Sequence, residues 1–260
     1  IRIRGRKLAL DKPITMPLRL QSTQFVSALL LIGAEVQTDS QSPYISLTRE
    51  VINRFREGSL QTLDEVEPDW SSAAFWLERQ ALGLVDDVRF EGLDMCSGQG
   101  DRVAVELFGK IRERSLDRWD FSSCPDLYPA AAVCCHLLGL HPVFTGLETL
   151  PHKESDRLKA VAHNLRLIDE KFTNLHIYTF TNCFNLRLKS FSDHRIAMAF
   201  LAAGFPVDDT ACISKSYPAF LSQLLRCERL VALREGSPAP VFRDGLITRI
   251  QPDGGQGKKH

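Results

Sequence analysis

The sequence lacks an excess of charge of either sign. It contains 32 Lys and Arg and 32 Asp and Glu among 260 residues, which gives a formal net charge of zero. Proteins that bind nucleic acid or anionic membranes over a broad surface usually carry a basic excess. The composition therefore gives no argument for either partner, and it leaves room for a small anionic ligand held by a few local cations.

Long hydrophobic runs are also missing. The longest apolar stretches, residues 25–33 and 128–140, are shorter than the roughly 20 residues that a helix needs to cross a bilayer. Hydrophobic residues make up 44% of the chain and charged residues 25%, as in ordinary globular domains and unlike disordered or fibrous proteins. We therefore expect no membrane partner, and a fold with one large core or two smaller ones.

The 7 cysteines do not form a metal-binding pattern. No Cys-x-x-Cys pair is matched by a second pair of Cys or His, as a structural zinc site requires. Cys134 and Cys135 lie in an apolar helical stretch and are expected to fill the core. An odd, irregular set of cysteines favours a reduced protein of the cytoplasm, without a metal.

Apolar residues recur at helical spacing in several segments, and short strand-like segments lie between them. The spacing predicts helices at residues 25–32, 43–55, 75–81, 103–111, 127–138, 158–168 and 196–203, and strands at 88–90, 142–144, 175–180 and 186–188. This alternation predicts an α/β or α+β fold, with a domain junction near Pro68. Residues 1–5 have the alternation of a strand already in progress, so we expect an N-terminally truncated chain. We also expect a poorly ordered tail beyond Leu224.

Short polar side chains stand at the starts of five predicted helices: Ser22-Thr23, Asp69, Asp126, Ser155-Asp156 and Ser192-Asp193. Such a side chain can accept a hydrogen bond from a free backbone amide, and helix capping is the ordinary explanation for each. The alternative is that repeated units direct several helix N-termini toward one cleft, where they would favour an anion. The sequence pattern alone leaves both explanations open.

Two of these helix starts also carry cations. Lys153 and Arg157 are about one helical turn apart, with Glu154 beside them, and Arg195 lies in the first turn of another helix. Such cations can hold a carboxylate or phosphate, with Arg supplying a bidentate fork. For Lys153, Glu154 and Arg157, the competing explanation is a solvated helix start. His194, which precedes Arg195, would by itself be a structural histidine.

Three further sites have weaker patterns. Asp126 precedes an apolar helix, and it could act as a base if a substrate hydroxyl came within hydrogen-bond reach. Lys215 lies in a predicted loop, where a cation ordinarily faces solvent. Residues 22–24 offer two hydroxyls and one amide, which suit a phosphate or a polyol.

Taken in order, these segments resemble the enolpyruvyl transferases, specifically the 5-enolpyruvylshikimate-3-phosphate synthases. The resemblance rests on Ser22-Thr23-Gln24-Phe25, Asp69-Trp70-Ser71-Ser72-Ala73, Gln99-Gly100-Asp101, Pro125-Asp126, Lys153-Glu154-Ser155-Asp156-Arg157, Asp193-His194-Arg195 and Lys215. It extends over about residues 10–224, and the Lys-Glu-Ser-Asp-Arg and Asp-His-Arg segments together are its most specific part. The resemblance implies two domains, each built from three βαβαββ units, with the substrates between them. Residues 1–66 would be part of the shikimate-3-phosphate-binding domain, 67–224 the second domain, and 225–260 the tail.

The resemblance also implies a reaction, which is the transfer of the enolpyruvyl group of phosphoenolpyruvate to the 5-hydroxyl of shikimate 3-phosphate, with release of phosphate. Asp126 would be the base that deprotonates the hydroxyl, and Glu154 the acid that handles the proton near C3. The residues implied to bind shikimate 3-phosphate are Ser22, Thr23, Gln24, Asp126, Thr149 and Lys153. Those implied to bind phosphoenolpyruvate are Gln24, Arg157, Arg195 and Lys215. Thr149 stands where the family more often has Asn.

The resemblance implies no metal and no organic cofactor, and we expect a cytoplasmic protein that is a monomer when full length. The family's N-terminal Lys-Ser motif and its Arg-bearing segments would precede Ile1, so we expect the chain alone to be inactive. Two alternatives are a UDP-N-acetylglucosamine enolpyruvyl transferase and a non-catalytic anion-binding fragment of the same fold. The pairing of the two charged motifs argues against the first, and the presence of both Asp126 and Glu154 argues against the second.

Overall fold

The computed structural model describes residues 12–16, 22–58, 66–171, 186–234, 240–243 and 246–249. Its helices are α1 (Gln24–Leu31), α2 (Pro43–Arg56), α3 (Trp70–Ala81), α4 (Ala104–Arg112), α5 (Tyr128–Leu137), α6 (Arg157–Lys171), α7 (His194–Ala202) and α8 (Phe220–Arg234). Its strands are β1 (Ile14–Thr15), β2 (Val36–Gln37), β3 (Arg118–Asp120), β4 (Val143–Thr145), β5 (Pro240–Arg243) and β6 (Leu246–Arg249). Short 3-10 helices include η1 (Gly100–Val103), η2 (Pro125–Leu127), η3 (Leu150–His152) and η5 (Ala211–Lys215).

The same order of elements occurs three times along the chain. Strand β1 pairs in parallel with β2, β3 pairs in parallel with β4, and Leu188 forms a parallel bridge with Val207. Parallel pairing needs a crossover connection, and α1, α5 and α7 supply it in the three cases. A further helix, α2, α6 or α8, follows each pair. The fold is therefore α/β, mostly helical with small parallel sheets, while the complete βαβαββ unit stays a prediction.

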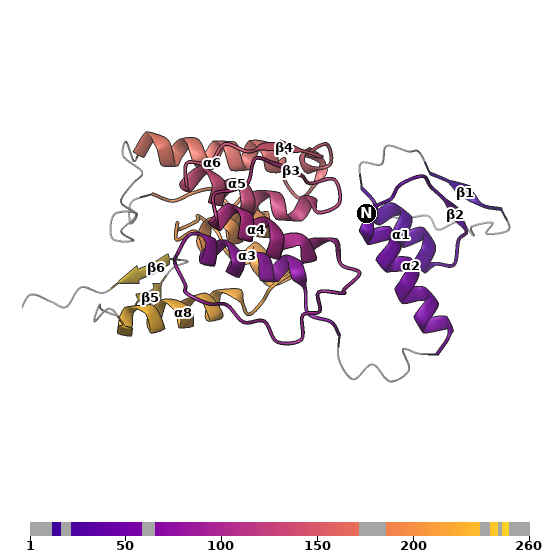
Figure 1. Cartoon of the computed structure of the whole chain (residues 1–260), viewed down its shortest axis with the longest axis horizontal. Helices are drawn as coiled ribbons and strands as arrows, with labels where there is room; N and C mark the ends of the chain where they lie inside the picture. The colour runs from indigo at the N-terminus through magenta and orange to yellow at the C-terminus, as the bar shows by residue number, and fades with distance from the viewer. Residues whose placement is uncertain are drawn as a thin grey trace, which may run out of the picture.

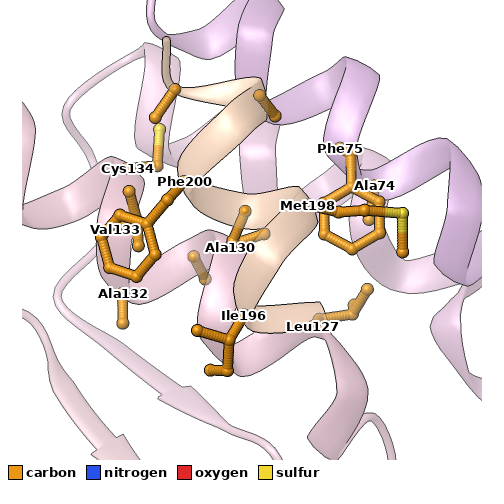
Figure 2. Close-up of a cluster of buried hydrophobic side chains, with 14 of the residues drawn as sticks. Ala74, Phe75, Leu127, Ala130, Ala132, Val133, Cys134, Ile196, Met198 and Phe200 are labelled. Atoms are coloured by element: carbon orange, nitrogen blue, oxygen red, sulfur yellow. The ribbon is translucent and has the colours of Figure 1, made fainter. Parts of the chain in front are cut away.

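The main core surrounds α7, which packs against α3 and α5. Figure 1 labels α3, α4 and α5 in this main body. Figure 2 shows Ile196, Met198 and Phe200 of α7 among small side chains of α5 and the side chain of Phe75 of α3. Small residues such as Ala130 let the helix backbones approach closely. Each large apolar side chain buried here contributes about 1.5–3 kcal/mol, so this body carries the larger share of the folding free energy.

A smaller body is formed by β1, α1, β2 and α2, and Figure 1 shows it beside the main one. Among the described residues, its core has five that are hydrophobic and buried: Val26, Leu30, Ala34, Val36 and Ile45. Large apolar side chains remain exposed on the same helices, with Phe25 61% and Phe55 74% accessible. Because so little apolar surface is buried, we expect the smaller body to be the less stable part of the chain.

All seven predicted helices are confirmed, as α1 to α7, and β4 confirms the predicted strand at 142–144. The strand predicted at 88–90 is wrong, because these residues form neither a strand nor a bridge, and the ring of Phe90 lies near that of Trp70. The strand predicted at 186–188 reduces to the single bridge at Leu188. The strands predicted at residues 1–5 and 175–180 lie outside the described residues.

The helical pattern does not end near Leu224, as the sequence predicted, since α8 continues to Arg234. Phe220, Leu224 and Glu228 occupy successive buried positions of α8, and the charged residue at the third position hides the apolar repeat. Strands β5 and β6 then pair in antiparallel fashion. Poor order of the tail stays a prediction for its other residues. Among the described helices, none has both the length and the apolar character needed to cross a membrane.

Candidate active site

The starts of three helices in the main body bring charged side chains together. Asp126 lies in η2 just before α5, Arg157 is the first residue of α6, and Arg195 lies in the first turn of α7. Asp126 follows β3, and Arg195 follows the bridge residue Leu188. Both thus lie beyond the carboxyl ends of parallel strands, which is where α/β proteins bind their ligands.

Asp126 contacts three cations. Its Oδ1 lies 2.7 Å from Nη1 of Arg157 and 3.2 Å from Nζ of Lys153, and its Oδ2 lies 3.0 Å from Nη2 of Arg195. The N-cap positions of η2 and α5 belong to Cys124 and Leu127 instead. The capping explanation is therefore wrong for Asp126, whose carboxylate forms ion pairs.

These cations determine the ionisation of Asp126. Burial by itself would raise the pKa of the carboxyl, but the charges of Arg195, Lys153 and Arg157 outweigh burial and hold its pKa well below the usual range. The group is therefore ionised, as a proton acceptor must be. A carboxylate held by so much positive charge is nevertheless a weak base, and any ligand that draws the cations away would strengthen it.

Arg157 lies at the centre of the cluster and is only 1% exposed. Its Nε donates to Oδ2 of Asp193 at 2.9 Å, its Nη1 to Asp126, and its Nη2 to Oε2 of Glu154 at 2.6 Å. A buried charge is costly unless it is paired, and the three carboxylates provide that pairing. One guanidinium thus fixes the relative positions of Asp126 and Glu154, the two residues predicted to move protons.

Asp193 has a second function besides capping. It caps α7 as predicted, accepting a hydrogen bond from the Arg195 amide at 2.9 Å, and it also accepts one from Ser155 Oγ at 3.0 Å. Burial would raise the pKa of Asp193, but Arg157 and these hydrogen bonds lower it further than burial raises it. The contact with Arg157 could not be predicted from the sequence, because a cap motif does not reveal a partner on another helix.

His194 faces Glu154, with 3.8 Å between Nδ1 of the imidazole and Oε1 of the carboxylate. Burial and the neighbouring charge of Arg195 lower the pKa of the imidazole below its ordinary value. His194 is therefore neutral near pH 7, and it adds no further positive charge to the cluster at that pH.

A second acid, Asp101 of η1, lies next to Asp126. It accepts hydrogen bonds from Ser71 Oγ and, at 3.3 Å, from Tyr44 Oη. Burial and the negative charge of Asp126 raise the pKa of Asp101 to about 6, although Arg195 lowers it. Because Tyr44 belongs to α2, its hydrogen bond joins the two bodies of the chain. Asp101 belongs to one of the segments that carry the family resemblance, but no role was predicted for it.

A cavity of about 380 Å³ opens beside these acids, and its lining includes Tyr44, Ser71, Asp101, Asp126 and Arg195. Gly100 lets the two bodies approach here, since a Cβ on it would lie 2.5 Å from the carbonyl oxygen of Ser123 and 3.1 Å from Cβ of Pro43. Within the described ranges, no three His, Cys, Asp or Glu side chains are arranged to hold a metal ion.

Other predicted site residues lie apart from this cluster. Lys215 is exposed at the end of η5, and no ion pair in the described part of the chain links it to Asp126. Ser22, Thr23 and Gln24 lie at the start of α1, where Ser22 Oγ accepts a hydrogen bond from the Gln24 amide at 3.3 Å. Thr149 precedes η3, and its buried Oγ1 has no hydrogen-bond partner among the described residues. Their roles as ligand contacts stay predictions.

Comparison with known proteins gives a consistent family. Residues 18–224 match the family described as EPSP synthase (3-phosphoshikimate 1-carboxyvinyltransferase). A 3-phosphoshikimate 1-carboxyvinyltransferase of Bacteroides fragilis is 29% identical over 86% of this chain and 67% of its own length. The proteins of that name from Methanopyrus kandleri and Clostridium kluyveri are 33% and 32% identical over 78% and 76% of this chain.

This chain spans 67% of the length of the Bacteroides relative and 58% of the other two. The family match includes every residue of the Asp126 cluster, which consists of Asp101, Asp126, Lys153, Glu154, Arg157, Asp193 and Arg195. The chain belongs to the EPSP synthase family.

Proposed function

We propose that this chain provides the second-domain active site of an enzyme that transfers the enolpyruvyl group of phosphoenolpyruvate to the 5-hydroxyl of shikimate 3-phosphate and releases phosphate. Such a reaction belongs to the shikimate pathway, which supplies chorismate and the aromatic amino acids. The observation that carries the proposal is the convergence of Asp126, Lys153, Glu154, Arg157 and Arg195, with ion pairs of 2.6 to 3.2 Å. These residues come from the motifs on which the family resemblance rests.

The architecture proposed for the complete protein is the enolpyruvyl-transferase fold, with substrates bound between two domains. Residues 1–66 belong to the first domain and residues 67–224 to the second. The threefold order of strand, helix, strand and helix supports repeated units. The hydrogen bond between Tyr44 and Asp101 supports a site at the boundary between the two bodies.

In the proposed mechanism, the oxygen of the 5-hydroxyl attacks C2 of phosphoenolpyruvate while Asp126 accepts the hydroxyl proton. Glu154 delivers a proton to C3. The tetrahedral adduct then loses a proton from C3 and expels phosphate, which gives the enolpyruvyl ether. Arg157 supports this division of roles, because its Nη1 and Nη2 atoms hold Asp126 at 2.7 Å and Glu154 at 2.6 Å. Positioning and charge stabilisation supply most of the catalysis in such a site.

The two ligands are assigned to different residues around Asp126. Lys153 contacts the shikimate 3-phosphate, together with Thr149 and residues 22–24. Arg157, Arg195 and Lys215 hold the phosphate and carboxylate of phosphoenolpyruvate, to which Gln24 also reaches. Arg195 supports this assignment, because it lines the cavity and carries a charge that a ligand oxygen can reach.

The test uses a complete enzyme, made by joining the N-terminal part of the Bacteroides fragilis relative to this chain. We expect this chimera to release phosphate only when both substrates are present. Asp126→Asn should lower its turnover about 10²–10⁴-fold, because the amide cannot accept the proton. Asp117→Asn, which removes an exposed carboxylate just before β3, is the matched control and should leave turnover unchanged.

The chain by itself is expected to bind ligands without measurable transfer. Turnover of the chimera that is insensitive to Asp126→Asn would contradict the proposed base. Turnover that requires UDP-N-acetylglucosamine in place of shikimate 3-phosphate would support the alternative acceptor and contradict the proposed one.

A further inference from the structure

Three of the cations assigned to the ligands already form ion pairs with carboxylates of the protein. Arg195, Lys153 and Arg157 all contact Asp126. Arg157 also contacts Glu154 and Asp193. Three cations therefore face three carboxylates. A cluster without a positive excess has little attraction for an anion, so a binding anion must replace one of the carboxylates.

Asp126 is the carboxylate best placed to be replaced. Asp193 is completely buried and is also held by a backbone amide and by Ser155 Oγ. Glu154 pairs with Arg157, and the side chain of Glu154 is 47% exposed. Asp126 lines the cavity together with Arg195, and within the described chain its two oxygens are held by the cationic side chains alone.

Asp101 is the acid that can take up a proton when a binding anion replaces Asp126. The groups that face it are Tyr44 from α2, Asp69 and Ser71 from the start of α3, Asp126 from η2 and Arg195 from α7. Arg195 is the cation among them, and it stabilises the ionised forms of both Asp101 and Asp126. When an anion engages Arg195, two neighbouring acids lose this stabilisation, and both cannot easily stay ionised.

We propose that Asp126 and the anionic ligand compete for Arg195 and Lys153, and that Asp101 takes up one proton from solvent when the ligand displaces Asp126 from these cations. The proton adds to a carboxylate oxygen of Asp101, so the charge that the anion brings is partly offset. Asp126 stays ionised but is released from its strongest counterions, which makes it a better base. The ligand thereby activates the group that its reaction uses. This inference rests on the proposed function only in taking the cavity as the place where phosphate and carboxylate groups bind.

Inorganic sulfate is a suitable probe, because it is chemically inert and its charge is constant from about pH 5 to 8. Calorimetric titration of the 260-residue chain, in buffers of different ionisation enthalpy, measures both affinity and proton uptake. We expect net proton uptake near pH 7, and sulfate affinity about tenfold higher at pH 6 than at pH 8. Absence of sulfate binding, or binding without proton uptake, would overturn the proposal.

Two variants separate the competitor from the proton acceptor. Asp126→Asn removes the competing charge and should raise sulfate affinity at pH 8 about tenfold or more. Asp101→Asn should abolish the proton uptake and flatten the dependence of affinity on pH. Asp117→Asn changes the net charge equally at an exposed position and should behave like the parent chain.

Unchanged or weaker sulfate binding by a folded Asp126→Asn chain would overturn the proposal. If that variant does not fold, proton uptake by the parent chain decides the matter. The outcomes are independent of the proposed reaction. An inactive chimera with intact exchange of sulfate for protons would refute the proposed function alone. An active chimera without that exchange would refute this inference alone.

Discussion

Two groups of buried charges in the main body differ in their surroundings: one lies beside a cavity, and the other is enclosed in the core. In the Asp126 cluster, several cations and carboxylates share contacts beside a cavity. In the second group, Arg79 of α3 pairs with Glu228 of α8 and donates to the Ala202 carbonyl at 2.9 Å, all inside the core. Both arrangements satisfy charges that would otherwise be costly to bury. Only the first can exchange a protein carboxylate for an anion from solution, so burial alone does not identify a site.

The largest expected effect on stability comes from breaking the enclosed pair. Arg79→Met leaves Glu228 buried without its cation, and we expect the free energy of unfolding to fall by about 3–5 kcal/mol in urea titrations. Sulfate affinity should not change, because the pair has no contact with the Asp126 cluster among the described residues.

The double variant Arg79→Met with Glu228→Met provides the control, since it replaces the whole pair with apolar side chains. It should recover most of the lost stability. A single variant as stable as the parent, or one that alters sulfate binding, would break the distinction between the two groups.

A smaller effect is expected at Glu78, which is buried on α3 beside Arg79 and whose carboxyl oxygens accept no hydrogen bond from the described residues. Burial raises its pKa well above the ordinary value, although Arg79 opposes the shift. The folded protein therefore keeps this proton at pH values where the unfolded chain has lost it. Stability is then lost as the pH rises above the ordinary pKa of glutamate.

Glu78→Gln mimics the protonated acid and should remove this loss. We expect the variant to be more stable than the parent by about 1–3 kcal/mol at pH 7, and nearly equal to it at pH 4. Urea unfolding at the two pH values provides the measurement. A gain that is the same at both values would contradict the assignment of a proton to Glu78.

The smallest expected effect concerns Lys215, which lies outside the charged cluster in this structure. If it reaches phosphoenolpyruvate as a single exposed cation, Lys215→Ala should weaken binding about threefold to tenfold, in line with the modest value of exposed charges. Sulfate binding at Arg195 should stay the same. Unchanged affinity for phosphoenolpyruvate would remove Lys215 from the site and leave the comparison between the two charge groups intact.

Local patterns account for most of the helices, because amphipathic spacing and capping residues act within a few positions. The spacing of Ile196 and Phe200 predicts α7, and Asp69 and Asp193 cap helices as expected. Pairing between segments that are distant in the sequence was harder to predict. The short strand β3 has too few residues for a pattern, and its parallel partner β4 is separated from it in the sequence by α5.

The candidate site, too, was predictable from the sequence only in part. Its charged residues stand out in the sequence because Arg195 in the first turn of a helix, and Lys153 next to Arg157, need anionic partners. The identity of those partners depends on tertiary structure. Asp126, predicted by default to be a cap, forms ion pairs with all three cations, and Asp101 joins them from η1.

The central claim is that the cations around Asp126 bind the anionic groups of phosphoenolpyruvate, and calorimetric titration tests it most directly. The titration would add phosphoenolpyruvate to the chain in the presence of shikimate 3-phosphate, with Arg195→Gln as the test variant and Arg118→Gln, at an exposed position of β3, as the control. We predict that Arg195→Gln weakens binding about 30-fold or more, whereas Arg118→Gln has no effect. Equal affinities in the two variants would contradict the claim.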